Sequence, residues 1–186
     1  MRLFIGILLP ADLQRRLAKL KDRLAWLPVR GVWPAAENLH ITLKFLGEVP
    51  DDAVKPLCDA MGSCPRPEAA VVLRPDRLVL FPPAGPARVL GAGFSGDTGK
   101  ICQLQQGLEI VCQEAGFPLE GRAFTPHATL ARFRDGLQMR HVPRMTRDFE
   151  SLLPLPEFPC TQFQLMHSEL TNRGSQYTPV ASFPID

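Results

Sequence analysis

Leu39-His40-Ile41-Thr42-Leu43 and Pro126-His127-Ala128-Thr129-Leu130 share the pattern His-x-Thr-Leu within a chain of 186 residues. The two histidines lie 87 residues apart, which is nearly half the chain. Each stretch is predicted to be a strand that follows an amphipathic helix and a loop. This repetition predicts two lobes related by a pseudo-two-fold axis.

The alternation of side chains along a strand decides what these motifs expose. Residues i and i+2 of a strand point to the same face. His40 and Thr42 are therefore expected on one face, with apolar neighbours buried on the other. His127 and Thr129 repeat this arrangement. Two such faces brought together would line a polar cleft with two imidazoles and two hydroxyls.

This set of side chains suits phosphodiester chemistry. Opening a cyclic phosphate needs a base that takes a proton from water and an acid that protonates the departing ribose oxygen. Imidazoles perform both steps near neutral pH, and Thr hydroxyls can donate hydrogen bonds to the phosphate oxygens. The sequence contains neither an H-E-x-x-H pattern nor a carboxylate cluster that would hold a metal. We expect neither a metal nor a cofactor.

The elements around the motifs predict the fold class. Apolar residues at helical spacing predict a helix of about four turns from Leu13 to Leu27, with Asp12 as its cap and Pro28 at its end. Further helices are predicted over residues 51–61, 98–115 and 144–153. Strands are predicted within residues 1–10 and over residues 40–46, 71–73, 77–81, 87–94, 125–133, 161–170 and 176–183, with a turn at 172–175. Because no βαβαβ series appears, the order favours α+β over a doubly wound parallel sheet.

Length and composition limit the class of protein. Apolar residues make up 45% and charged residues 22% of the chain, as in ordinary globular proteins. The length suits a single domain of two packed lobes over residues 1–186. The apolar start, residues 1–10, is short and lacks a small-residue cleavage site, so we interpret it as a buried strand of a cytoplasmic protein. The five cysteines are scattered and form no C-x-x-C pair.

Charge is concentrated in one segment. The net charge of the chain is only +2, but residues 121–147 hold six arginines and one acid. Such a segment either provides a positive field for a phosphorylated ligand or forms a solvated connector.

Gly91–Gly96 reads G-x-G-x-x-G, which in isolation suggests dinucleotide binding. No parallel strand with an acidic end is predicted after it, so we interpret it as a flexible loop. The segment from Gly93 to Lys100 imitates a phosphate-binding P-loop, but its glycine spacing is wrong and Ile101 stands where Ser or Thr is required. This mismatch counts against ATP-dependent ligation.

Longer stretches around the two motifs resemble a known family. Trp33-Pro34 through Glu37-Asn38-Leu39-His40-Ile41-Thr42-Leu43-Lys44-Phe45-Leu46-Gly47-Glu48-Val49 is similar to the first signature of RNA 2′,3′-cyclic phosphodiesterases. Phe124-Thr125-Pro126-His127-Ala128-Thr129-Leu130-Ala131-Arg132 is similar to the second. These proteins are 2H phosphoesterases, formerly described as 2′-5′ RNA ligases. The opening residues 2–5 and the closing residues 168–170 and 174–177 also resemble the family.

The resemblance implies a two-lobed α+β fold in which each lobe is an antiparallel sheet backed by helices, with the active site in a central cleft. It implies hydrolysis of an RNA terminal 2′,3′-cyclic phosphate to a 2′-phosphate, with His127 activating water and His40 protonating the leaving oxygen. Thr42, Thr129 and Arg132 would bind the phosphate. Strand geometry alone leaves the roles of the two histidines interchangeable, and any 2′-5′ ligation would be a weak reversal of hydrolysis.

Four further residues are candidates for a place in or beside the site. Arg132 falls on the face opposite His127 unless a bulge or the strand end returns it. Lys44 shares the parity of His40, so we expect it either to reach substrate phosphates or to be exposed. Phe45 is expected in the core, and Tyr177 is left open as a residue that could stack on a base.

Other functions remain open at this stage. The same site could act on ADP-ribose 1″,2″-cyclic phosphate or on an oligoadenylate, bind RNA ends without chemistry, or belong to a metallohydrolase. We expect a monomer that acts on RNA and has no contact with a membrane.

Overall fold

The computed structural model describes residues 1–28, 30–172 and 174–185. All described strand pairs are antiparallel. The strands are β1 (Arg2–Leu8), β2 (Gly31–Val32), β3 (His40–Glu48), β4 (Val72–Phe81), β5 (Ala87–Gly96), β6 (His127–Leu137), β7 (Phe158–Pro159), β8 (Gln162–Thr171) and β9 (Gly174–Pro184). They form one sheet in the order β7-β4-β5-β6-β3-β1-β8-β9, with β2 paired to β6.

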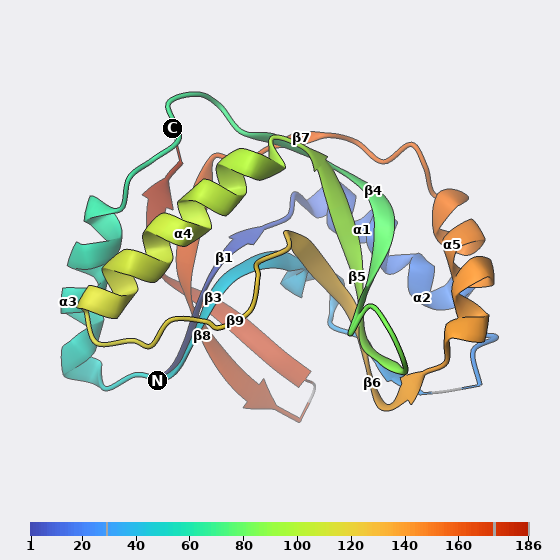
Figure 1. The fold of residues 1–186 in the computed structure, drawn as a ribbon. Coiled ribbons are helices and arrows are strands. Elements are labelled where there is room, and N and C mark those ends of the chain that lie inside the picture. The colour runs from blue at the N-terminus through green and yellow to red at the C-terminus, as the bar shows by residue number, and fades with distance from the viewer. Residues whose placement is uncertain (29, 173, 186) are drawn as a thin grey trace.

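The sheet has a narrow joint at its middle. Strands β3 and β6 pair at a single register position, Ile41 opposite Ala128. The joint divides the sheet into a first half-sheet, β3-β1-β8-β9, and a second half-sheet, β6-β5-β4-β7. Figure 1 shows the two halves as separate groups of strands, each with its own helices. The predicted α+β fold with two pseudo-symmetric lobes is confirmed.

The helices connect the two halves in a repeated way. They are α1 (Ala11–Ala18), α2 (Leu20–Arg23), α3 (Asp51–Ser63), α4 (Thr98–Glu114) and α5 (Val142–Glu150), with short 3₁₀ turns η1 (Ala36–Asn38) and η2 (Met139–His141). Helix α4 follows β5 of the second half-sheet but packs with α3 against the first, contacting β3. Helix α1 follows β1 of the first half-sheet, and its Leu17 lines a small gap with Leu130 of β6. Each half-sheet thus receives a helix from the other.

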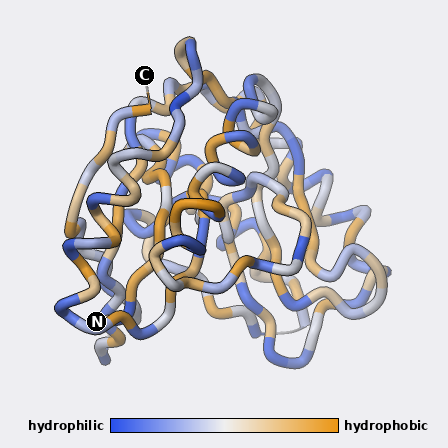
Figure 2. The backbone as a smooth tube through the Cα atoms, turned by 60° about the vertical axis from the view of Figure 1, so that its left-hand side comes forward, coloured by the Kyte–Doolittle hydropathy of each residue, from blue (hydrophilic) through white to orange (hydrophobic). Residues whose placement is uncertain are grey.

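The core explains why these helices form. The apolar residues Leu13, Leu17, Leu20 and Leu24 recur at helical spacing and are all buried. They belong to one continuous cluster that also contains Ile41 and Leu43 of the first motif strand and Ala128 and Leu130 of the second. Figure 2 shows hydrophobic and hydrophilic residues alternating along the same elements, as expected for elements with one buried face.

Several predicted boundaries are wrong. The helix predicted from Leu13 to Leu27 is interrupted at Lys19, and its second piece ends at Arg23. Asp12 is not the cap; it lies in the first turn, where it pairs with Arg16 at 2.9 Å. The segment 91–96, interpreted as a flexible loop, is the end of strand β5. The turn predicted at residues 172–175 includes residue 173, which lies outside the described residues.

No helix in residues 1–28, 30–172 and 174–185 is long and apolar enough to cross a membrane.

Candidate active site

A bulge in β6 turns Arg132 toward the face that carries His127. Gly91 is paired with Thr129, but the preceding residue, Leu90, is paired with Ala131, so β6 holds one extra residue at this point. Leu130 and Ala131 are both buried in consequence, and Arg132 is exposed. The alternation therefore resets, and Arg132 joins His127 and Thr129 on one face.

The same bulge occurs at the equivalent position of β3. Gly6 is paired with Thr42, whereas Ile5 is paired with Lys44. Leu43 and Lys44 are both buried, and Phe45, the equivalent of Arg132, emerges with 54% of its surface exposed. The expectation that Phe45 lies in the core is therefore wrong.

Lys44 also differs from its prediction. It is 1% exposed, and its Nζ donates to Glu109 Oε2 at 2.6 Å and to the Pro118 carbonyl at 2.8 Å. Glu109 lies on α4 and also accepts hydrogen bonds from Gln105 and from the Glu120 backbone. The prediction that Lys44 reaches substrate or solvent is wrong, because the bulge turns the side chain into the core, where this carboxylate balances its charge.

The joint brings the two motifs together. Because Ile41 and Ala128 lie opposite each other in antiparallel strands, their flanking residues share the other face of the sheet. His40 and Thr42 of the first half-sheet thus meet His127 and Thr129 of the second. Arg132 completes the set from the same face of β6. The electrostatic influence of Arg132 reaches both imidazoles, and that of His127 reaches His40.

Both imidazoles are held in the same tautomer. His40 Nδ1 lies 2.6 Å from the carbonyl oxygen of Asn38, and His127 Nδ1 lies 2.7 Å from that of Thr125. A carbonyl oxygen only accepts hydrogen bonds, so each Nδ1 must carry the proton. The Nε2 atoms are therefore the positions that gain or lose a proton. His40 Nε2 lies 3.0 Å from Thr42 Oγ1, which fixes the ring from its second side.

Each imidazole lies over a glycine of the neighbouring strand. A Cβ on Gly6 would come within 3.2 Å of His40 Cδ2, and one on Gly91 within 3.1 Å of His127 Cδ2. An aromatic ring also lies beside each imidazole: Phe4 lies 4.7 Å from His40, and Phe81 lies 4.5 Å from His127, between ring centroids. The two imidazoles therefore have equivalent surroundings.

Burial changes the acid–base properties of the pair. It is the largest cause that lowers the pKa of His40 below its ordinary value, and the nearby charges of Arg132 and His127 lower it further. The carbonyl of Asn38 acts in the opposite direction. Burial likewise lowers the pKa of His127, with Arg132 adding to the effect and the Thr125 carbonyl opposing it. Neutral imidazoles are thus favoured at neutral pH.

Tyr177, left open by the sequence, stands beside the first motif. Its ring meets His40 edge-on at 5.2 Å and Phe4 at 4.9 Å between centroids. Asn38 Nδ2 donates to the Ser175 carbonyl at 2.5 Å and ties β9 to the segment that holds His40. Sequence reasoning missed the part played by Gly6, Gly91, Phe4 and Phe81. A glycine inside a strand pattern is the signal that could have pointed to the first two.

Within the described ranges, no group of three or more His, Cys, Asp or Glu side chains is placed to hold a metal ion.

Comparison with known families accounts for the repeated halves. The family model of LigT-like phosphoesterases matches residues 7–90 and residues 96–177, one segment around each His-x-Thr motif. The chain belongs to this family. The LigT-like model therefore covers most of the described sheet and both motif strands.

Curated relatives carry one shared name. An RNA 2′,3′-cyclic phosphodiesterase of Thermus thermophilus is 30% identical over 192 aligned positions, which cover 100% of this chain and 90% of the relative. One of Aeropyrum pernix is 28% identical over 162 residues, which cover 87% of this chain and 90% of the relative.

Solved structures share the fold over the whole LigT-like chain. TT0787 of Thermus thermophilus superposes with a TM-score of 0.77 at 26% identity, covering 100% of this chain and 98% of its own. Escherichia coli LigT complexed with 3′-AMP superposes with a TM-score of 0.74 at 26% identity, covering 99% and 96%.

Proposed function

We propose that this protein hydrolyses the terminal 2′,3′-cyclic phosphate of RNA to a 2′-phosphate, with His40 and His127 as general acid and base and without a metal ion. One observation carries the proposal: the single-pair joint between β3 and β6 puts two imidazoles of the same tautomer on one face. Each therefore offers its Nε2 to the same bound phosphate. The names of the curated relatives support the substrate class.

The proton transfers balance over one turnover. His127 Nε2 takes a proton from water as the water oxygen forms a bond to phosphorus. The bond between phosphorus and the ribose 3′ oxygen breaks, and His40 Nε2 gives its proton to that oxygen. The products are a 3′-hydroxyl and a 2′-phosphate. Proton exchange with solvent then restores a neutral His127 and a protonated His40. The near-symmetry of the site also permits the reverse assignment, which the variants below distinguish.

The remaining residues of the site bind the phosphate. Thr42 and Thr129 lie beside the two histidines and donate their hydroxyl protons to the non-bridging oxygens. Arg132 faces the same phosphate with a guanidinium whose fork matches two oxygens at once. Charge on these oxygens grows in the transition state, so donors fixed in advance stabilise it more than the ground state.

The first half-sheet presents aromatic rings where the terminal nucleoside would lie. Phe45 is exposed at the position equivalent to Arg132, and Tyr177 stands edge-on to His40. A base stacked on such rings gains affinity with little dependence on sequence. We accordingly expect a broad range of RNA ends as substrates for a monomeric enzyme. Ligation in the 2′-5′ sense would be the reversal of the same reaction, with a hydroxyl in the position of water, driven by substrate concentration.

The test is direct hydrolysis in the presence of a chelator. A short RNA ending in 2′,3′-cyclic phosphate is incubated with the protein in excess EDTA, and the product is identified by phosphorus NMR. We expect a 2′-phosphate from the wild type, and loss of the product in His40→Ala and His127→Ala. His141→Ala is the control, because His141 lies in η2 against Trp26, away from the joint.

Each alternative function has its own outcome in this test. Turnover that EDTA abolishes would indicate a metallohydrolase. Binding of the RNA without turnover would indicate an end-binding protein. Turnover only of another cyclic phosphate, such as ADP-ribose 1″,2″-cyclic phosphate, would change the substrate and keep the site.

A further inference from the structure

The second half-sheet carries further arginines on the face of His127. Gly93 of β5 is paired with His127 on one side and with Arg77 of β4 on the other, so all three point to the same face. A Cβ on Gly93 would lie 3.0 Å from Arg77 Cγ and 3.1 Å from its Nε. The side chain of Arg77 therefore lies across Gly93, the residue that separates its strand from His127.

This placement suits a second phosphate rather than the reacting one. The backbones of Arg77 and His127 are two strand spacings apart, about 10 Å. Arg77 shortens that gap by leaning over Gly93, where it shares the space left by the missing side chain with Val79. Adjacent phosphates of a single RNA strand are separated by a similar order of distance.

Asp76 reduces the charge of Arg77 without occupying all of its donors. Its Oδ1 accepts from Arg77 Nη1 at 2.8 Å, and the Arg77 side chain is 51% exposed. A guanidinium has five N–H donors, so one carboxylate contact leaves donors for a phosphate. Asp76 is the extra residue of a bulge in β4, between Pro75, paired with Phe94, and Arg77, paired with Gly93.

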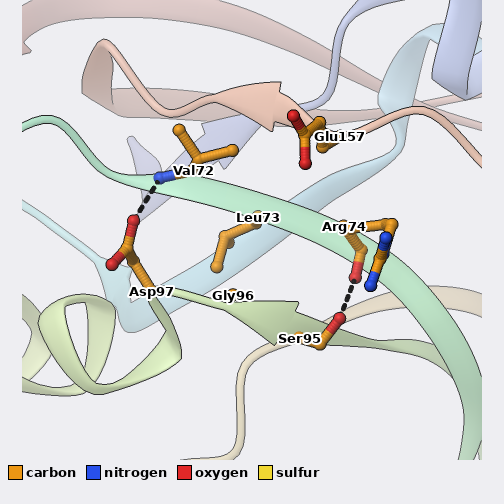
Figure 3. A pocket seen from close by; sticks show the side chains of 7 residues that line it. All are labelled: Val72, Leu73, Arg74, Ser95, Gly96, Asp97 and Glu157. Carbon is orange, nitrogen blue, oxygen red and sulfur yellow. Dashed lines mark hydrogen bonds between the residues drawn. The ribbon is translucent and has the colours of Figure 1, made fainter.

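A hollow lies one step further along the same face. Arg74 is paired with Ser95, two residues beyond Gly93 along β5. Arg74 and Ser95 line a hollow of about 240 Å³ together with Asp97 and Glu157, as Figure 3 shows. Ser95 Oγ donates to the Arg74 carbonyl at 3.4 Å, and Asp97 accepts from the Val72 backbone at 2.9 Å. This volume lies just below the usual range for small-ligand sites.

The charges of the hollow decide which part of a nucleotide it suits. Glu157 would repel a phosphate, but it can accept hydrogen bonds from ribose hydroxyls or from the amino groups of a base. Asp97 is already engaged, by the Val72 backbone and by Lys100 Nζ, which lies 3.2 Å from its Oδ1. Arg74 adds a planar guanidinium, which can stack on a base. The hollow therefore matches a nucleoside. Arg77 lies between the hollow and His127, so it matches the phosphate on the 3′ side of that nucleoside.

We propose that Arg77 binds the phosphate that links the last two nucleotides of the RNA, and that the hollow beside Arg74 and Ser95 receives the nucleoside upstream of that phosphate. This inference rests on the proposed function and extends it. It makes the protein selective for the end of an RNA chain over a free cyclic mononucleotide. It also assigns the direction in which the RNA strand runs away from the two histidines: across Gly93, over the second half-sheet.

Three substrates separate the two parts of the proposal. They are a nucleoside 2′,3′-cyclic phosphate, the same compound with an added 5′-phosphate, and a dinucleotide ending in 2′,3′-cyclic phosphate. For the wild type we expect kcat/KM to rise at each step, by about fivefold for one exposed phosphate contact. Arg77→Ala should remove the gain from the 5′-phosphate, and Arg74→Ala should remove the gain from the upstream nucleoside.

Two further variants control the charge argument. Asp76→Asn should increase the gain from the 5′-phosphate, because it removes the carboxylate that competes for Arg77. Arg15→Ala should leave both gains as in the wild type; Arg15 is likewise an exposed arginine paired with an aspartate, but it lies on helix α1. The gain from the 5′-phosphate should also fall with salt. A plot of its logarithm against the logarithm of the salt concentration should have a slope of about −0.7 per phosphate for a single strand.

The outcomes distinguish this inference from the proposed function. An equal effect of Arg77→Ala on all three substrates, or no effect on any, would overturn the phosphate site while hydrolysis itself stands. If the wild type converts none of the substrates, the proposed function fails. In that case the affinities of the same three compounds, measured by calorimetry, decide the site: equal affinities for wild type and Arg77→Ala would refute it.

Discussion

The two half-sheets repeat one construction and differ in what it exposes. Each has a His-x-Thr-Leu strand, a carbonyl two residues earlier that holds the imidazole, a glycine beneath the ring and a bulge after the motif. In the first half-sheet the bulge buries Lys44 and exposes Phe45. In the second it buries Ala131 and exposes Arg132.

The shared part and the differing part serve different tasks. The shared part presents two equivalent Nε2 atoms, which is what acid–base catalysis on one phosphate needs. The differing part adds the aromatic residues Phe45 and Tyr177 to the first half-sheet and the cationic residues Arg77 and Arg132 to the second. A symmetric reaction centre is thus combined with an asymmetric surface, on which a nucleoside and its phosphates can bind in only one orientation.

The equivalence of the two imidazoles predicts the largest effects. We expect His40→Ala and His127→Ala each to lower kcat by about 10²–10⁴-fold, the usual contribution of a general acid or base. Since both residues act on one phosphate, the double variant should lose far less than the product of the two single effects. Single-turnover kinetics on cyclic-phosphate RNA measures this. If one variant retained wild-type kcat, the two halves would not be equivalent.

The residues buried by the two bulges should differ most in their contribution to the free energy of unfolding. Lys44→Met should lower the free energy of unfolding by about 3–5 kcal/mol, because it leaves Glu109 buried without its partner. Replacing both residues by Met should restore most of the loss. The equivalent position in the other half, Ala131, has no charge to remove. Urea denaturation monitored by circular dichroism is the measurement. A loss below about 1 kcal/mol for Lys44→Met would mean that the pair contributes little.

The residues that follow the bulges should affect different kinetic constants. Arg132→Ala should lower kcat by about 10²-fold, as expected for a donor that stabilises transition-state charge. Phe45→Ala should mainly raise KM, by an amount that reflects about 1–3 kcal/mol of base stacking. Steady-state kinetics on a dinucleotide substrate separates the two. Equal effects of both variants on KM alone would remove the distinction between a cationic and an aromatic half.

Substitution of Gly6 and Gly91, the glycines beneath the two imidazoles, should give the smallest effects on kcat, and similar effects in both halves. In Gly6→Ala and Gly91→Ala the new methyl group would press on His40 or His127 at 3.2 or 3.1 Å. We expect kcat to fall about 10-fold from misplacement of each ring. Gly99→Ala, in helix α4 with open space around it, is the matched control and should keep full activity. Unchanged kcat in both variants would show that the rings tolerate displacement.

The sequence was sufficient to predict which residues of the motifs share a strand face, but not where the bulges occur. The alternation of His40 and Thr42 with Ile41 and Leu43 was sufficient to place the motifs on one exposed face. It failed at the next residue of β3, Lys44, because a bulge depends on the register with a neighbouring strand, which local sequence does not specify. The partner that stabilises a buried Lys44, Glu109, lies 65 positions further along the chain.

Glycine misled the sequence reading for a related reason. The spacing of Gly91, Gly93 and Gly96 imitates a nucleotide-binding loop, yet each glycine makes room for a different contact within β5. His127 lies over Gly91, Arg77 lies over Gly93, and Gly96 adopts a φ of +95° where a side chain would strike the Val72 carbonyl. Only the neighbouring strands reveal these reasons. Alternation allows Arg132 to reach the face of His127 only through a bulge or the end of the strand, and a bulge is present in β6.

The pH dependence of kcat/KM tests most directly the claim that the two histidines act as one acid and one base. The wild type should give a bell whose optimum lies on the acidic side of neutrality, because burial lowers the pKa of both His40 and His127. The rate should rise with pH as His127 loses its proton and fall as His40 loses its own. His127→Ala should lack the rising limb, and His40→Ala the falling limb. A wild-type profile that is flat from about pH 5 to 8 would contradict the account.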